Sequence, residues 1–230
     1  MSSESERYNL PNEMPIHLIG AHHTNAQSSP SGKPETDVQT NYTEILATVI
    51  REVRAQWVAE EYSEEAEKES KRLSLTPRVA AENGAKHRFC DPTKEERKKI
   101  GYVGQQDLHL YIGMHDNDWN ISNDDARRKS WALDIGKYFE VRERFWLEKI
   151  ADLKEKTVVF VCGDAHVDTF TKQLKAKGWD VHVAARGVGG ITDEDQRNIA
   201  EGLQYLKEHP EILDEDWFSR VYPNAGSGSG

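Results

Sequence analysis

The sequence predicts an α/β fold, a mostly parallel central sheet flanked by helices with a helical insertion or cap in the middle. Residues 157–163, TVVFVCG, are a continuous apolar run, which is typical of a strand at the centre of a parallel sheet. A helix-like segment that ends at Gly178 follows, and then the strand-like run WDVHVAAR. This order is that of a βαβ unit, whose two strands are parallel.

The first part of the chain alternates in the same way. Residues 15–23, PIHLIGAHH, read as a buried strand ended by glycine, and residues 24–40 as a long loop. Apolar residues at helical spacing from residue 41 to 53 predict an amphipathic helix. Residues 56–63, QWVAEEYS, and 86–92, KHRFCDP, predict two short strands. Between them, Thr76 as N-cap and Pro77 in the first turn predict a helix that Gly84 ends.

The middle of the chain interrupts this alternation. Residues 93–138 mix charged helix-like runs with a stretch rich in Asn and Asp, residues 111–125, which predicts a turn or loop. We expect an insertion or cap here. Helices are predicted again at residues 137–153 and 193–211. Residues 1–223 are thus expected to form a single α/β domain, and the Gly/Ser-rich residues 224–230 a linker or tag-like tail.

Composition excludes several classes of protein. The chain has 230 residues, is 37% hydrophobic and contains no apolar run near the roughly 20 residues that a membrane span requires. The first residues lack the basic and apolar regions of a secretory signal, so a cytoplasmic location is expected. A net charge of -10 makes nucleic acid an unlikely partner. Cys90 and Cys162 lie in apolar runs and are expected to be reduced core residues.

Two Gly-x-x-His motifs follow strand-like runs at opposite ends of the chain. Gly20 and His23 form the first motif, and Gly163 and His166 form the second. In an open α/β sheet, ligands bind at the carboxyl ends of the strands, where both histidines are expected. The strand containing Glu60 and Glu61 ends at the same edge.

Histidine with carboxylate is the ligand set of a divalent metal site that keeps a position open for water. His23, Glu61 and His166 are the candidate metal ligands. The alternative is catalysis without metal, in which a histidine activates water and a glutamate orients it. Glu61 could also belong to the acidic first turn of a helix, favoured by the helix dipole.

Short islands across residues 14–185 resemble a superfamily that contains the TraB/PrgY/GumN proteins, Tiki metalloproteases, erythromycin esterases and ChaN haem-binding lipoproteins. The islands are LIGAHH, VAEEY, RERFWLEKI and the segment VVFVCGDAHVDTFTKQLKAKGWDVHV. The resemblance matches His23 and His166 to the paired motifs, Glu60 or Glu61 to a strand-end glutamate, and Arg142 to a helix arginine. A Tiki-like chain implies a peptidase that uses manganese, cobalt or zinc. An erythromycin esterase-like chain implies ester hydrolysis without a required metal, and a ChaN-like chain implies haem binding.

The chain departs from this pattern directly after the first glycine. Many esterase-like and ChaN-like members have glutamate there, whereas this chain has Ala21. Alanine at this position is compatible with a TraB-like branch, with a divergent or binding-only member, or with a variant that has lost its activity.

Together these features predict a hydrolase, expected inside the cell, that acts on a peptide or ester bond and is either metal dependent or metal free. His23, His166 and Glu60 or Glu61 would hold the metal or activate water, and Arg142 would stabilise the oxyanion. The rival hypothesis is a non-catalytic module of the same fold that binds haem or another ligand, or a subunit of a larger assembly. A protein that docks a partner or a second copy through its acidic surface is a third hypothesis.

Overall fold

A computed structural model describes residues 14–22, 27–115, 123–190 and 193–223. Its centre is a five-stranded sheet in the order β5-β3-β6-β1-β7, and every neighbouring pair is parallel. The strands are β1 (Ile16–Ala21), β3 (Trp57–Glu60), β5 (Lys86–Phe89), β6 (Val158–Gly163) and β7 (Val181–Val188). The predicted fold class is therefore confirmed. Because all strands run the same way, their carboxyl ends share one edge of the sheet.

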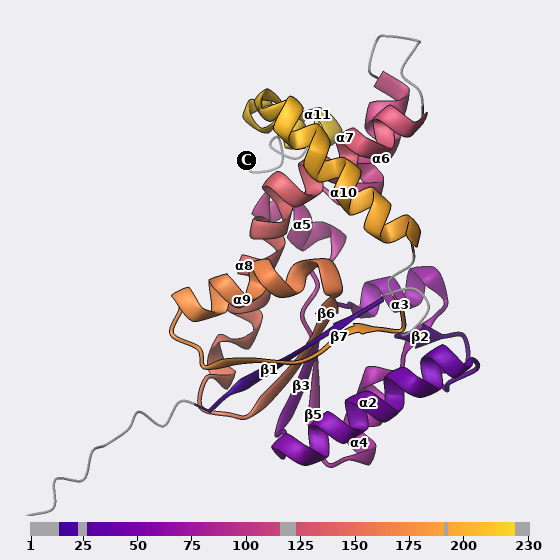
Figure 1. Ribbon diagram of the computed structural model, residues 1–230, viewed down its shortest axis with the longest axis vertical. Helices are drawn as coiled ribbons and strands as arrows, with labels where there is room; N and C mark the ends of the chain where they lie inside the picture. The colour runs from indigo at the N-terminus through magenta and orange to yellow at the C-terminus, as the bar shows by residue number, and fades with distance from the viewer. Residues whose placement is uncertain (1–13, 23–26, 116–122, 191–192, 224–230) are drawn as a thin grey trace, which may run out of the picture.

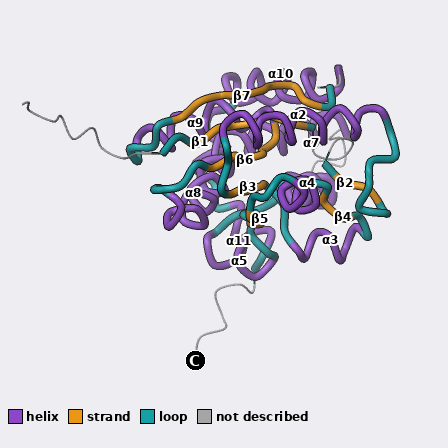
Figure 2. The backbone as a smooth tube through the Cα atoms, turned by 90° about the horizontal axis from the view of Figure 1, so that it is seen from below, coloured by secondary structure: helices purple, strands orange, loops and turns teal. Residues whose placement is uncertain are grey.

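Helices cover both faces of the sheet, which lies between them in Figure 2. Helices α2 (Asp37–Val53) and α4 (Thr76–Glu82) cover one face, and α8 (Phe139–Ile150) and α9 (Val167–Ala176) cover the other. Each face has its own apolar cluster. Ile19 and Val159 belong to the cluster under α2 and α4, whereas Leu18 and Phe160 belong to the cluster under α8 and α9. This alternation along each strand places successive side chains on opposite faces.

A group of helices stands beyond the carboxyl edge of the sheet, at the top of Figure 1. We call it the cap. It consists of α5 (Lys94–Ile100), α6 (Gln105–His115), α7 (Asn123–Leu133), the π-helical turn η1 (Asp134–Tyr138), α10 (Asp193–Glu208), the 3-10 turn η4 (Pro210–Asp214) and α11 (Trp217–Val221). The cap has its own apolar core, centred on buried residues such as Leu108, Leu133 and Trp217. The predicted helical region at 93–138 is therefore present, but the C-terminal helices join it.

The structure corrects three local expectations. Residues 111–115 and 123–125, predicted as turn or loop, are helical. Helix α4 is capped one residue earlier than predicted, at Leu75, because the Thr76 hydroxyl hydrogen-bonds to Tyr42 Oη, 2.7 Å away, instead of capping the helix. Strand β1 continues through Gly20 to Ala21 instead of ending at the glycine.

Several short elements lie at the carboxyl edge of the sheet. The helix with an acidic first turn is present as α3 (Glu64–Ser70), but it begins after Glu61 and does not include it. Strands β2 (Ser28–Ser29) and β4 (Leu73–Ser74), which pair antiparallel, and the 3-10 turn η3 (Asp164–His166), which joins β6 to α9, were not predicted. At the opposite edge, the end of the helix predicted for residues 137–153 is a 3-10 turn, η2 (Ala151–Leu153). Both cysteines are buried and free, as predicted.

Candidate active site

The two adjacent glutamates at the end of β3 face opposite sides of the sheet. Both are buried, with Glu60 0% and Glu61 2% exposed. Glu60 faces the side covered by α4, where its carboxylate accepts a hydrogen bond from Ser74 Oγ at 2.8 Å and contacts His87 Nε2 at 2.8 Å. Glu61 faces α8. The strand alternation therefore separates Glu60 from the other predicted site residues, and Glu61 is the glutamate that accompanies His166.

Arg142 links Glu61 to the end of β5. Its Nη1 atom pairs with Glu61 Oε1, and its Nε atom donates to Asp91 Oδ1 at 2.6 Å. Trp146 Nε1, 3.3 Å away, also points to Asp91 Oδ1. Burial lowers the pKa of Arg142, but the carboxylates of Asp91 and Glu61 together raise this pKa well above its usual value. Arg142 is thus a fixed cation that pairs with two buried carboxylates.

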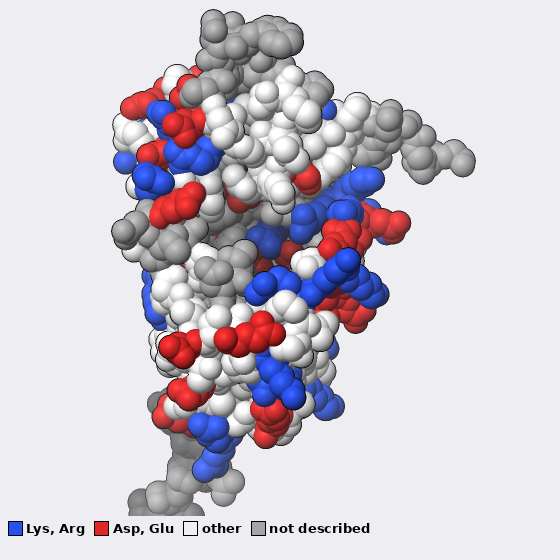
Figure 3. All heavy atoms as spheres, turned by 90° about the vertical axis from the view of Figure 1, so that its right-hand side faces the viewer, with Lys and Arg blue, Asp and Glu red and all other residues white. Residues whose placement is uncertain are grey.

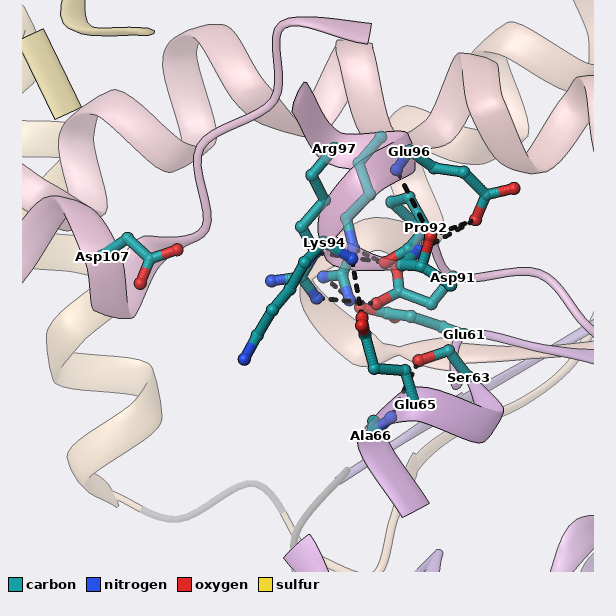
Figure 4. A network of polar contacts seen from close by, with 12 residues as sticks. Glu61, Ser63, Glu65, Ala66, Asp91, Pro92, Lys94, Glu96, Arg97 and Asp107 are labelled. Carbon is teal, nitrogen blue, oxygen red and sulfur yellow. Dashed lines mark hydrogen bonds and ion pairs between the residues drawn. The ribbon is translucent and has the colours of Figure 1, made fainter. Parts of the chain in front are cut away.

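This network continues to the surface between the sheet and the cap (Figure 4). Arg97 of α5 donates to Asp91 Oδ2 at 3.2 Å, on the side away from Arg142. The backbone N–H of Lys94 donates to Glu65 Oε2 at 2.6 Å, which joins α5 to α3. The face of the molecule that carries α3 is hollowed between the cap and the sheet layer, and Lys and Arg side chains gather beside the hollow (Figure 3). The carboxyl edge of the sheet lies at the level of this hollow.

The imidazole of His166 is held on three sides. Its Nδ1 atom lies 2.9 Å from Glu143 Oε1, and its ring packs against that of Phe139, with centroids 3.7 Å apart and an interplanar angle of 30°. Trp146 packs edge-on against the same ring, with centroids 4.9 Å apart. The remaining nitrogen, Nε2, faces Glu61 Oε1 at 3.7 Å, which is too long for a direct hydrogen bond. A carboxylate on Nδ1 keeps the proton on that nitrogen and leaves Nε2 to accept one.

Glu143 is itself fixed and fully buried. Thr169 Oγ1 donates to its Oε1 atom at 2.5 Å, and Gln173 Nε2 donates to its Oε2 atom at 2.6 Å. Both donors come from α9, the helix that follows His166. Sequence reasoning missed Glu143, although it lies beside Arg142 in the RERFWLEKI segment. Its only sequence signal was an acidic side chain on the apolar face of a helix, four residues after Phe139 and three before Trp146.

The glycines of the two motifs have identifiable roles. A Cβ atom on Gly20 would lie 2.2 Å from Asp164 Oδ1 and 2.8 Å from Val167 Cγ2. The close approach of the turn after β6 to β1 therefore requires a residue without a side chain at position 20. Gly163 donates its backbone N–H to Glu61 Oε2 at 2.7 Å, which fixes the carboxylate beside His166. Gly20 thus allows the turn that carries His166 to pack against β1, and Gly163 positions Glu61 beside His166.

The predicted metal ligands are only partly placed. His23 lies outside the described residues. Across residues 14–22, 27–115, 123–190 and 193–223, no three His, Cys, Asp or Glu side chains gather as a metal site would need. Glu61 Oε1 is already paired with the Arg142 guanidinium. The described residues therefore fit an acid–base site better than a metal site, and the metal stays a prediction that depends on His23.

Ala21 lies apart from these groups. It is 2% exposed and belongs to the apolar cluster under α2 and α4, on the opposite face of β1 from Gly20. The structure gives no account of a functional glutamate at this position.

Comparisons with known proteins leave the family unassigned. The chain matches no protein-family model, and comparisons with curated proteins and with solved structures find no match. Among the described helices, none combines the length and apolarity that crossing a bilayer requires. The fold and the geometry of the site are therefore the basis for the function proposed below.

Proposed function

We propose that this protein is a hydrolase of ester or peptide bonds in which His166 activates the attacking water. One observation carries the proposal: the His166 ring is held by Glu143 at Nδ1, while Nε2 faces Glu61 at the carboxyl edge of the sheet. A base oriented by a buried carboxylate is the arrangement that general-base catalysis needs. The paired Gly-x-x-His motifs and their resemblance to esterases and peptidases support the same reaction class.

In the proposed reaction, His166 Nε2 accepts a proton from water as the water oxygen attacks the substrate carbonyl. The imidazole becomes a positively charged imidazolium, and the Glu143 carboxylate, 2.9 Å from Nδ1, stabilises that charge. Phe139 and Trp146 prevent the ring from rotating out of place. The neutral base is therefore pre-oriented before the substrate binds.

Glu61 and Arg142 act beside this base. Glu61 is held by the Gly163 N–H and by Arg142, so its Oε1 atom keeps a fixed position 3.7 Å from His166 Nε2. From there it orients a water that is in contact with the imidazole. Arg142 adds the positive charge that opposes the charge of the developing oxyanion.

Metal dependence is a separate part of the proposal. A divalent ion held by His23, Glu61 and His166 would polarise the carbonyl and make bound water more acidic. Elemental analysis of protein prepared without chelator tests this part directly. About one ion per chain, lost in both His23→Ala and His166→Ala variants, would support it, whereas a metal-free parent with full turnover would exclude it.

Hydrolysis itself is tested with p-nitrophenyl and ethyl esters of acetate, butyrate and N-acetylated amino acids, together with short peptides. We expect turnover by the parent and a loss of kcat of about 100-fold or more in His166→Ala, the usual share of a general base. His209→Ala is the matched control, because His209 lies on the cap with its side chain 46% exposed. A parent that hydrolyses none of these substrates, or a His166→Ala variant with parental kcat, would refute the proposal.

A further inference from the structure

A row of polar side chains extends from the cap to the site along one helix face. Asp134 and Tyr138 lie in the π-helical turn η1, and Arg142 follows in α8. Residues four apart lie on the same side of a helix. Phe139, the first residue after η1, packs against the ring of His166. The turn therefore ends next to a residue that contacts the proposed base, and π-helical turns occur frequently at functional sites.

Asp134 is the acidic member of this row. It is 6% exposed, and its Oδ1 atom is buried with no hydrogen-bond partner within the described part of the chain. Buried polar atoms in folded proteins almost always have a partner, so a carboxyl oxygen without one requires an explanation. A substrate or a transferred proton would supply it.

The charged groups that act electrostatically on Asp134 come from four other parts of the fold. They are Arg142 on α8, His166 after β6, Glu61 after β3 and Arg97 on α5. Tyr138, on the same turn as Asp134, also has a buried hydroxyl without a partner among the described residues. Asp134 thus lies in the cap, within electrostatic reach of His166 and Glu61 at the carboxyl edge of the sheet. A substrate bound between the cap and this edge would have the base on the sheet side and the carboxyl on the cap side.

We propose that Asp134 is the general acid of this site and protonates the leaving group while His166 activates water. This inference rests on the proposed hydrolase function and adds a residue to it. The acid is needed after water has attacked, when the leaving group departs, because an alkoxide or amide anion is too basic to leave without a proton.

Every proton in this step is accounted for. Water forms a bond to the carbonyl carbon, and its proton goes to His166 Nε2. The bond from that carbon to the leaving oxygen or nitrogen breaks, and the leaving atom takes the proton from the Asp134 carboxyl. Transfer of the proton from His166 to Asp134 through solvent then restores both groups, with no oxidant or co-reactant.

The protonation of Asp134 agrees with this role. Burial raises the pKa of Asp134 to about 6, although the Arg142 cation opposes the rise. Glu61 contributes to the rise, and His166 and Arg97 oppose it. A buried carboxyl whose pKa is raised towards neutrality can donate a proton near neutral pH.

The test compares two esters of the same acid in the parent and in Asp134→Asn. A p-nitrophenolate leaves without a proton, whereas an ethoxide needs one. We expect Asp134→Asn to lower kcat for ethyl esters about 100-fold and to keep kcat for p-nitrophenyl esters within about threefold. Retained p-nitrophenyl ester turnover also shows that the variant is folded. Asp124→Asn, on α7 with its side chain 72% exposed, is the matched control and should be unchanged with both esters.

The outcomes separate the acid role from the hydrolase function. An equal loss with both esters, or no loss with either, would overturn the acid role and leave the hydrolase proposal standing. A parent without turnover on any ester of the panel would overturn both. A kcat for ethyl esters that falls above about pH 6 in the parent, with no such fall for p-nitrophenyl esters, would further support the assignment.

Discussion

Replacing Arg142 with methionine should destabilise the protein strongly. Methionine keeps most of the volume of the side chain but removes the cation between Glu61 and Asp91, whose side chains are 1% and 6% exposed. Removing one partner of a buried ion pair costs about 3–5 kcal/mol because the remaining charge is buried without compensation. Glu61 loses its cation in this variant, whereas Asp91 keeps Arg97, so we expect a loss of about 3 kcal/mol in the free energy of unfolding.

Urea denaturation at pH 7, followed by circular dichroism, measures this loss. Arg144→Met is the matched control, since Arg144 lies on the same helix and is exposed. Its free energy of unfolding should remain within about 0.5 kcal/mol of the parent value. The double variant Arg142→Met/Glu61→Gln should be more stable than Arg142→Met alone, because it carries one uncompensated charge fewer. An Arg142→Met protein within about 1 kcal/mol of the parent would refute the buried-pair reasoning.

Three further changes test other parts of the structure. Gly20→Ala should lower the free energy of unfolding by about 1–3 kcal/mol, because the added Cβ atom overpacks the contact with the turn after β6. Gly113→Ala is the control and should not lower it, because no heavy atom lies within 4 Å of its added Cβ atom. Equal effects of the two changes in urea denaturation would contradict the close approach at β1. The stability of Asp134→Asn relative to the parent should increase by about 2 kcal/mol between pH 4.5 and 7.5. The reason is that the parent loses stability as pH rises from the usual pKa of 3.8 through the folded pKa of about 6. A difference in the free energy of unfolding that does not depend on pH would refute the raised pKa. Glu60→Gln should lower stability by about 1–2 kcal/mol through its bonds on the α4 face and keep kcat within about threefold, and a large loss of turnover would place Glu60 in the site.

The fold could be predicted because its signals are local. The apolar run of β6 and the turn glycines after α4 and α9 need no knowledge of distant contacts. Helix α8 was predicted from the spacing of Phe139, Trp146 and Ile150, and all three are buried. The cap was predicted only as an insertion, because its apolar core is completed by helices about a hundred residues later in the chain.

The site could be predicted only in part. Strand ends of a parallel sheet bring His166 and Glu61 together, so the edge was predictable from the fold class alone. Which of two adjacent glutamates turns towards the histidine depends on the phase of a short strand, and a shift of one residue would exchange them. Glu143 and Asp134 are determined by contacts between distant segments. Neither has a motif of its own, and the position of Asp134 depends on a π-helical turn that the pattern of apolar residues does not predict.

In the proposed mechanism, Glu143 acts through His166 to activate water. The most direct test is kcat on the p-nitrophenyl ester that the parent hydrolyses best, measured for Glu143→Gln, His166→Ala and the double variant. The account predicts a large loss in each single variant and no further loss when Glu143→Gln is added to His166→Ala, because the two residues form one unit. Losses that multiply in the double variant would show that Glu143 acts independently and would contradict the account.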